Sequence, residues 1–402
     1  MVDGFINFNL NEKTPTIIKV IGVGGGGGNA VEYMYEKGIC DVDFVICNTD
    51  YQALRNSPIP CKIQLGKELT AGHGAGNNPA MGEKSAQESL ADIEAILKKD
   101  TRMAFITAAM GGGTGTGAAP VIARLSKDMG ILTVGIVSVP ARFEGPKRLD
   151  QARDGLRRLK DHVDCLIVID NEKIKSIYGS QTISQAFAKA NDVLNIAAKG
   201  IAEIITLPGY INVDFADVRT VMTDSGVAIM GAAQASGEDR AIRAITEALE
   251  SPLLNNNDIL GAKDILLNIT SGTDEITMDE MSQITSHIIR KVGNNAAVIW
   301  GVGTDPDLGD AVSVTIIATG FPTGDIELFG EENTCAGYAK QPECLKEEEV
   351  RVKPGLTEEQ VRELETVPAS TPFLSSSVII WATSFFPSVS IGIPRSSNHD
   401  FS

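Results

Sequence analysis

The amino-acid sequence predicts an α/β fold: a doubly wound, mostly parallel sheet, a long central helix, and a second, smaller α/β domain. Two observations carry this prediction. Short apolar runs rich in Val and Ile alternate with helical or turn segments, and strands that are apolar throughout are typical of a parallel sheet covered by helices on both faces. Glycine-rich loops follow several of these runs, and parallel sheets bind ligands in the loops beyond the carboxyl ends of their strands.

The 402-residue chain is longer than one hydrophobic core usually grows, so we expect two domains with flanking segments. In the N-terminal part of the chain, the predicted strands are rich in β-branched apolar residues. They are 16–23, 44–47, 103–109, 132–139 and 166–169. Residues 183–207 have apolar residues at helical spacing before Pro208-Gly209, which predicts a central helix. After it, we expect strands at 264–270, 296–302 and 312–318 and a helix at 278–292.

These elements predict six segments along the chain. They are an N-terminal arm (1–15), a first α/β domain (16–182), the central helix (183–208), a C-terminal domain (209–322), a charged linker (323–366) and a tail of atypical sequence (367–402). The linker is dense in Glu, Lys and Arg and holds little core-forming material.

The most informative loop follows the predicted strand at 103–109. Its residues are Gly111, Gly112, Gly113, Thr114, Gly115, Thr116 and Gly117. Five glycines leave backbone N–H groups free to converge on an anion, and the two threonines add hydroxyl donors. The alanine-rich stretch 118–125 predicts a helix whose N-terminus points at the same anion. The loop is therefore predicted to hold phosphates.

A second glycine cluster lies between the first predicted strand and a helix start at 29–36. It contains Gly22-x-Gly24-x-x-Gly27, a formal dinucleotide fingerprint, and Asp50 loosely serves as the acidic residue that such a site needs. This fingerprint alone leaves a nicotinamide or flavin cofactor open. An NAD site does not need another phosphate cradle, however, and two glycine loops fit a triphosphate. The Gly-x-x-x-x-Gly-Lys-Ser/Thr pattern of P-loop enzymes does not occur.

Composition bounds the function further. The formal net charge of −17 argues against nucleic-acid binding, because phosphate backbones need clustered Lys and Arg. The six cysteines show neither a CxxC pair nor zinc-site spacing, so we expect no metal held by protein ligands alone. We find no signal peptide before the first strand and no apolar stretch of the roughly 18 residues that a membrane span requires. A cytoplasmic protein is expected.

Several strings occur in order at characteristic spacings: GVGGGGGNAV, NTD, GAGNNP, MGGGTGTGAAP, FEGPKR, KANDVL and NVDFADVRTVM. Together they resemble the tubulin/FtsZ family of GTPases over residues 17–321. The resemblance implies GTP/GDP as the ligand and a fold with a nucleotide-binding domain, a long core helix and a smaller α/β domain. It also implies a Mg²⁺ ion held mainly by phosphates and water.

The same resemblance implies a nucleotide site. Its phosphate-binding residues would be Gly25, Gly26, Gly27, Gly28, Asn29 and Gly111–Gly117, with Ala71, Gly72 and 74–77 closing over them. Glu144 and Arg148 would contact the ribose region. Asn171 and Asp192 would read the guanine, since a carboxylate that accepts from N1–H and the 2-amino group selects guanine over adenine. Without the family context, Asp192 is most simply a solvated helix carboxylate.

Asn212, Asp214 and Asp217 form the other expected site, which is catalytic. As residues alone they suit the start of a helix, where acids cap the first turn and complement the dipole. The resemblance implies a further role: this loop docks onto the nucleotide of the next subunit and positions the attacking water. Assembly into head-to-tail filaments and hydrolysis would then be linked.

The resemblance further implies a role in the bacterial division ring at mid-cell. Members of this family end in a short peptide with Pro-Ala and an aromatic residue, which binds membrane tethers such as FtsA. Here Pro368-Ala369 begins in that style, but Ser370-Thr371-Pro372 follows, so the tether contact is left open. Two alternatives also stay open. One is a scaffold that polymerises with nucleotide but does not hydrolyse it, and the other is a Rossmann-type NAD or FAD oxidoreductase.

Overall fold

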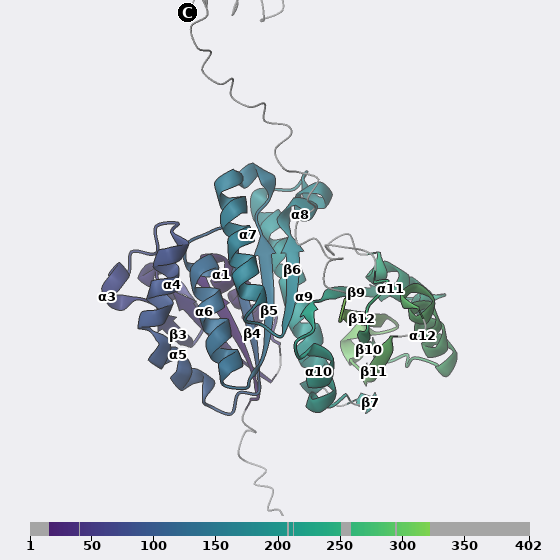
Figure 1. Cartoon of the computed structure of the whole chain (residues 1–402). Helices are drawn as coiled ribbons and strands as arrows, with labels where there is room; N and C mark the ends of the chain where they lie inside the picture. The colour runs from purple at the N-terminus through teal and green to yellow at the C-terminus, as the bar shows by residue number, and fades with distance from the viewer. Residues whose placement is uncertain are drawn as a thin grey trace, which may run out of the picture. The chain divides into compact units, whose positions relative to one another are not determined.

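The computed structural model describes residues 16–39, 41–206, 209–211, 213–250, 259–293 and 296–321. The predicted N-terminal arm, the charged linker and the tail of atypical sequence lie outside the described residues. Asn212 of the predicted catalytic loop lies outside them too. Figure 1 gives the labels of helices and strands that are used below.

The first sheet has seven parallel strands in the order β3-β2-β1-β4-β5-β6-β8. They are β1 (Ile18–Val23), β2 (Val42–Asn48), β3 (Cys61–Gln64), β4 (Met103–Ala109), β5 (Leu132–Val139), β6 (Cys165–Asp170) and β8 (Gly226–Val227). The strand order reverses direction between β1 and β4. In a doubly wound sheet this switch point is where ligands bind, and the two glycine loops follow these two strands.

Helices cover both faces of this sheet (Figure 1). They are α1 (Gly24–Glu36), α2 (Tyr51–Asn56), α3 (Lys67–Thr70), α4 (Pro79–Glu88), α5 (Leu90–Leu97), α6 (Thr114–Asp128), α7 (Pro146–Lys160) and α8 (Asn171–Tyr178). Alternate residues of each strand enter two separate cores: Ile18 and Val20 pack with α1, whereas Ile21 and Val23 pack with α5, α6 and α7. The apolar runs of the sequence therefore reflect burial on both faces.

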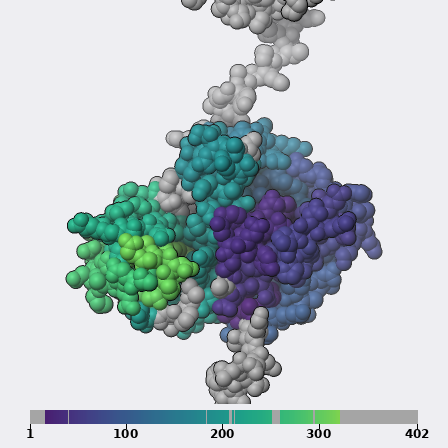
Figure 2. Space-filling view, turned by 180° about the vertical axis from the view of Figure 1, so that it is seen from behind, coloured from purple at the N-terminus to yellow at the C-terminus, as the bar shows by residue number. Residues whose placement is uncertain are grey.

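The long predicted helix is α9 (Ile183–Thr206), and its expected last residue, Leu207, lies outside the described residues. One core contains Leu194 and Ile201 of α9, strand residues of the first sheet, and Leu266 and Ile317 of the second sheet. In Figure 2 a teal band that includes this part of the chain lies between the purple N-terminal residues and the green second domain. Helix α9 thus packs against both sheets at once.

The second sheet is mixed, with the order β7-β11-β10-β12-β9. Its strands are β7 (Gly209–Ile211), β9 (Ile229–Ala235), β10 (Asp264–Ser271), β11 (Ala297–Thr304) and β12 (Val312–Thr319), and its helices are α10 (Phe215–Met222), α11 (Arg240–Leu249) and α12 (Met278–Val292). The three strands and the helix expected from the sequence are all present. β7, β9 and α11 were not expected: β7 has three residues, and β9 is rich in small residues that carry little strand signal.

Two helices begin earlier than the sequence indicated. α1 begins at Gly24 rather than at residue 29, and α6 begins at Thr114 rather than at residue 118. A glycine inside a helix costs about 1 kcal/mol relative to alanine, so propensity argues against both starts. Tertiary packing requires them nonetheless: a Cβ on Gly24 would lie 2.8 Å from the backbone nitrogen of Gly115. Glycine lets the first turns of α1 and α6 approach each other.

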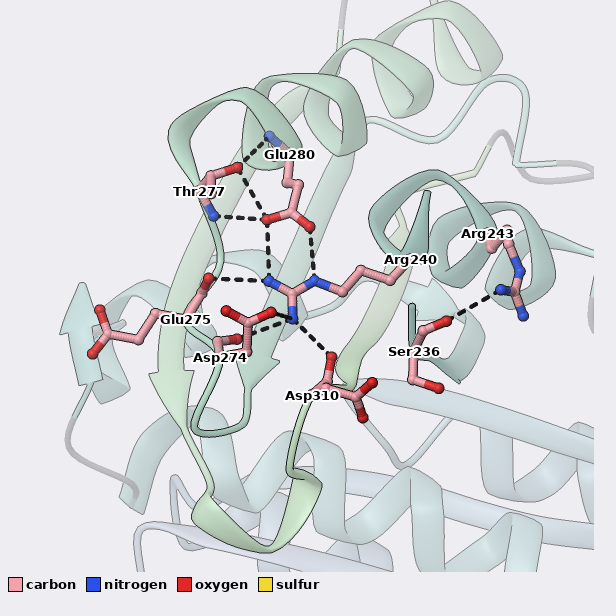
Figure 3. A network of polar contacts seen from close by, with 8 residues as sticks. All are labelled: Ser236, Arg240, Arg243, Asp274, Glu275, Thr277, Glu280 and Asp310. Carbon is pink, nitrogen blue, oxygen red and sulfur yellow. Dashed lines mark hydrogen bonds and ion pairs between the residues drawn. The ribbon is translucent and has the colours of Figure 1, made fainter. Parts of the chain in front are cut away.

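Figure 3 shows the main polar network of the second domain, centred on Arg240. The side chain is buried, and its Nε donates to Glu280 Oε1 (2.7 Å) while Nη2 donates to Glu280 Oε2 (3.3 Å). Its Nη1 and Nη2 also donate to backbone oxygens of Asp274, Glu275 and Asp310. A single guanidinium therefore joins the start of α11 to two loops and to α12.

The Arg240 contact makes a stability prediction. Its hydrogen bonds lower the pKa of Glu280 from 4.5 to about 2. A carboxyl group with a depressed folded-state pKa stabilises the fold above its unfolded pKa, and this contribution is lost as pH falls toward the folded value. We therefore expect Glu280→Gln to be less stable than wild type at neutral pH, and the difference to shrink as pH falls from about 5 toward 2.

Urea unfolding monitored by circular dichroism over that range measures the difference. Glu247→Gln, on an exposed position of α11, is the matched control and should change stability little. A Glu280→Gln deficit that stays constant with pH would contradict the assignment.

Candidate functional site

The two glycine loops lie against each other at the switch point of the first sheet. Gly24, at the end of β1, contacts Gly115 in the first turn of α6, and Gly26 faces Ala109 at the end of β4. The loop after β2 joins them, since the hydroxyls of Thr49 and Thr114 are 2.7 Å apart. Three segments far apart in the sequence thus form one continuous backbone surface.

The glycines of this surface are of two kinds. Some are required by packing: a Cβ on Gly27 would meet the carbonyl oxygen of Thr107, and one on Gly113 would lie 2.8 Å from the nitrogen of Asn78. Others have no such neighbour. A Cβ on Gly25, Gly28 or Gly112 would meet nothing within 4 Å. Internal packing does not explain glycine at these three positions, whereas close approach of a ligand to the backbone does.

The electrostatics of the surface favour an anion. Helices α1 and α6 both begin at it, so their unpaired N–H groups and positive dipole ends face it. Neither helix has an acidic residue in its first turn, although the whole chain carries a formal charge of −17. Acidic residues are common at such positions, and their omission here leaves the dipoles free for a bound anion.

Within the loop, the two threonines lie differently. Thr116 is fully buried, and its Oγ1 accepts from the N–H of Gly111 (2.8 Å). Its hydroxyl is therefore engaged inside the loop, where it fixes the turn between β4 and α6. Thr114 is partly exposed beside Thr49. Of the two expected hydroxyl donors, Thr114 is the one at the surface.

The segment from Ala71 to Asn77 borders the same surface. It has an unusual backbone, because Ala71, Gly72, Gly74, Gly76 and Asn77 all have positive φ. Such a conformation is costly for the two non-glycine residues and persists only where contacts hold it. Two hydrogen bonds do so: Tyr51 N–H donates to Gly72 O (3.1 Å), and Gln151 Nε2 donates to Asn77 O (3.2 Å).

A pocket is bounded by residues 143–144, which precede α7, by helix α8 and by the start of α9. Phe143 and Phe187 line it, and both rings are substantially exposed, at 66% and 46%. Asn171 also lines it, and its Oδ1 is buried without a hydrogen-bond partner. A buried oxygen without a donor is costly, so the pocket suits a flat ring that carries an N–H group. The sequence did not single out either phenylalanine.

The remaining expected nucleotide residues differ in their relation to this pocket. Glu144 lines it, and its carboxylate accepts from Arg148 Nη1 (2.7 Å) and from the N–H of Ala141 (3.0 Å). Asp192 does not line the pocket: its Oδ1 accepts from Tyr33 Oη (3.1 Å). Burial and the neighbouring Asp192 carboxylate raise the pKa of Tyr33. Tyr33 is therefore a further residue of this region that sequence reasoning missed, since nothing near it in sequence marks it.

Asp214 and Asp217 lie at the start of α10. Asp217 N–H donates to Asp214 Oδ1 (2.9 Å), and Asp214 N–H donates to Asp217 Oδ2 (3.3 Å), which is a reciprocal capping box. The capping role anticipated from the sequence is therefore real. It uses one oxygen of each carboxylate.

The two acids lie far from the glycine loops of the same chain. Phe187, near the start of α9, lines the pocket, whereas the last residue of α9, Thr206, precedes β7 and the acids. Nineteen residues of helix separate these two positions, about 28 Å at 1.5 Å per residue. Figure 1 shows α8 at the upper end of the view and α10 and β7 at the lower end. One chain does not bring the two expected sites together.

The described ranges also bear on two other classes of site. No group of three or more His, Cys, Asp or Glu side chains there could hold a metal ion. None of the helices there is long and apolar enough to cross a membrane.

Comparison with known proteins supplies the family. The model of the Tubulin/FtsZ family GTPase domain matches residues 17–179, and that of the FtsZ family C-terminal domain matches residues 226–322. The cell division protein FtsZ of Porphyromonas gingivalis is 50% identical over 324 residues, which are 80% of this chain and 71% of that protein. The chain belongs to the FtsZ family. The FtsZ of Buchnera aphidicola is also 50% identical, over 76% of this chain and 80% of that protein.

Solved structures agree with this assignment. An FtsZ dimer from M. jannaschii is 42% identical and has a TM-score of 0.73, with 79% of this chain and 91% of that chain covered. CetZ2 from Haloferax volcanii, at 20% identity and a TM-score of 0.66, shares the fold, with 77% and 94% covered. The predicted fold class and family are confirmed. The chain therefore belongs to a family of tubulin-like GTPases of cell division, and this membership implies a site for GTP or GDP.

The two kinds of glycine make opposite predictions in α1. Gly27→Ala should lower the free energy of unfolding by about 1–3 kcal/mol, because its methyl group meets a backbone oxygen. Gly25→Ala should retain wild-type stability, because its methyl group projects into open space, but should weaken GTP binding at least about tenfold. Urea unfolding and titration with a fluorescent GTP analogue measure the two effects. Equal stability losses in both variants would contradict the distinction between glycines required by packing and glycines that face open space.

Proposed function

We propose that this chain is a GTP-hydrolysing, filament-forming subunit of the bacterial division ring. In this proposal the glycine loops of one subunit bind GTP, and the acidic residues of the next subunit complete the active site. One observation carries it: α9 separates Asp214 and Asp217 from the glycine loops of their own chain. If both sets act on one nucleotide, they must come from two molecules.

The nucleotide half is supported by three glycines that internal packing does not explain and by one unpartnered polar atom. Gly25, Gly28 and Gly112 border open space beside two helix N-termini, which suits a chain of phosphates. The unpartnered Oδ1 of Asn171 suits an N–H group of guanine, and Phe143 and Phe187 offer faces for the ring. Glu144 and Arg148 border the space between base and phosphates, where a ribose would lie. Asp192 reaches the base in this proposal by exchanging its bond with Tyr33.

The catalytic half needs little chemistry from the protein. Phosphoryl transfer to water depends mainly on positioning and on stabilising charge. The capping box fixes Asp214 and Asp217 relative to α10, so each carboxylate presents its other oxygen to a water molecule. Asn212 adds an amide next to them in the sequence. A Mg²⁺ ion, held by phosphates and water, would neutralise the β- and γ-phosphate charge.

The separation of the binding surface from the acidic residues also leads to assembly. The binding surface and the acids lie at the two ends of α9, so contact between unlike ends joins subunits head to tail. Such contacts do not close on themselves and generate filaments. We place these filaments in the cytoplasm at mid-cell, as the family's role in division suggests. The tail expected to contact a tether such as FtsA lies outside the described residues.

Phosphate release measured against protein concentration, with GTP and then with ATP, tests the proposal. Turnover per subunit should rise cooperatively above a threshold protein concentration, because each site needs two protein molecules. This rise should occur with GTP and not with ATP. Sedimentation with GTP but without phosphate release would support a scaffold that does not hydrolyse. Turnover independent of concentration would contradict the shared site.

The acidic residues allow a more specific prediction. Asp217→Ala should bind GTP as wild type does but lose at least about 90% of its hydrolysis, about 1.4 kcal/mol or more in the barrier. Asp217→Asn should do the same while keeping an oxygen for the capping box, which separates charge from helix stability. GTP affinity and steady-state phosphate release measure the two effects.

Mixing two variants tests directly whether the active site is shared between two subunits. Asp217→Ala subunits keep an intact binding surface, and Gly25→Ala subunits keep intact acids. An equimolar mixture should therefore hydrolyse GTP faster than either variant alone. A mixture no faster than the sum of its parts would argue that both sets act within one subunit.

A further inference from the structure

The acidic residues are attached to the second sheet through a weak edge. β7 has three residues, lies at one end of the sheet order and pairs with β11, where the register shifts between Val302 and Gly303. A short edge strand with an irregular ladder has few backbone hydrogen bonds to hold it. Asp214 follows the end of β7 by three residues, so movement of β7 moves the cap of α10.

Packing against β11 holds β7 and the residue Val213 close to the second sheet. Val213 is 4% exposed, and a Cβ on Gly301 of β11 would lie 3.1 Å from its Cγ2 and 3.3 Å from the oxygen of Ile211. The absent side chain of Gly301 therefore lets the segment lie close to β11. This contact fixes the distance from the sheet. Besides this contact, only the short β7–β11 ladder opposes sliding of β7 along the edge within the described backbone.

A side-chain hydrogen bond fixes the other side. Tyr210, in the middle of β7, donates from Oη to Glu275 Oε1 at 2.7 Å. Its side chain is 70% exposed, so burial does not hold the ring in place. Hydrogen bonds to a carboxylate are shorter and stronger than neutral ones. The hydrogen bond to Glu275 also raises the pKa of Tyr210.

The acceptor of this bond is itself anchored. Glu275 O accepts from Arg240 Nη2 (3.0 Å), and Arg240 is 5% exposed and forms the bidentate pair with Glu280. Figure 3 shows the carboxylate of Glu275 directed away from Arg240, on the outer side of the loop. The Arg240 network thus holds the backbone of Glu275 and leaves its carboxylate available to Tyr210.

We propose that the Tyr210–Glu275 hydrogen bond is a latch that positions β7, and with it Asp214 and Asp217, for hydrolysis on the neighbouring subunit. The proposal rests on the proposed function. Tyr210 and Glu275 are positioning residues, because they act through the backbone that carries the acids. If the hydrogen bond acts in this way, its loss lowers GTP turnover within filaments. Nucleotide binding and filament assembly stay unchanged.

The test uses the full chain with Tyr210→Phe, Glu275→Ala and the double variant. Tyr210→Phe keeps the ring and removes the hydroxyl alone. Turnover per sedimented subunit at saturating GTP should fall about threefold to tenfold in each single variant, and the double variant should fall no further. GTP affinity and sedimented mass should match wild type. Hydrogen exchange of a peptide covering 209–217 should rise in all three variants.

Two controls accompany these variants. Glu275→Gln keeps an oxygen acceptor and should retain most of the turnover. Tyr35→Phe removes the hydroxyl of an exposed tyrosine that packs edge-on against Phe44, away from the latch, and should have no effect.

The outcomes separate the latch from the proposed function. Wild-type turnover and exchange in Tyr210→Phe, or additive losses in the double variant, would overturn the latch alone. Loss of sedimented mass in proportion to turnover would also overturn it, since the hydroxyl would then serve the filament contact. A wild-type protein that hydrolyses no GTP would contradict the proposed function, and exchange in 209–217 would still decide whether the latch exists.

Discussion

The packing of α9 against both sheets is the constraint on which the rest of the structure depends. Its small and branched residues, such as Ala198 and Ile201, enter a core shared by the two sheets. A helix buried between two sheets cannot bend or shift without disturbing their shared core, because protein interiors are close-packed. Its length therefore fixes the separation between the pocket lined by Phe187 at one end and the acidic residues at the other.

In the proposed function, that separation explains why the two halves of the site are built so differently. The binding half is made of backbone: helix N-termini, glycines that face open space and no acidic residue in the first turns of α1 and α6. The catalytic half is made of carboxylates held by a capping box. Placed side by side in one subunit, the carboxylates would repel the phosphates that the helix dipoles attract. Separate ends let each half be stable alone.

Glycine has a double role in this arrangement. At Gly24 and Gly27 the missing side chain lets the first turn of α1 lie against α6 and β4. At Gly25 and Gly28, on the same helix, it leaves room beside exposed N–H groups. The same residue type thus sets both the internal packing and the outer shape of the binding surface. This explains a run of five glycines that helix propensity alone disfavours.

The sequence by itself determined the fold class, strands β1, β2, β4, β5 and β6 of the first sheet, the length of α9 and the family, whereas the short strands β3 and β8 were not predicted. These features depend on local pattern: buried parallel strands are apolar throughout, a long helix keeps its 3.6-residue period, and the glycine strings are specific. It also identified the loops that meet at the switch point, because parallel strands end at one edge.

Only the tertiary structure decided where α1 and α6 begin, which glycines face open space, and which partners Thr116, Tyr33 and Tyr210 contact. Each depends on residues distant in the sequence: Gly24 meets Gly115, Tyr33 meets Asp192, and Tyr210 meets Glu275. A glycine or tyrosine carries no local signal of its partner. Such contacts appear when the chain is folded, because packing and hydrogen bonding depend on neighbours in space and not on neighbours in sequence.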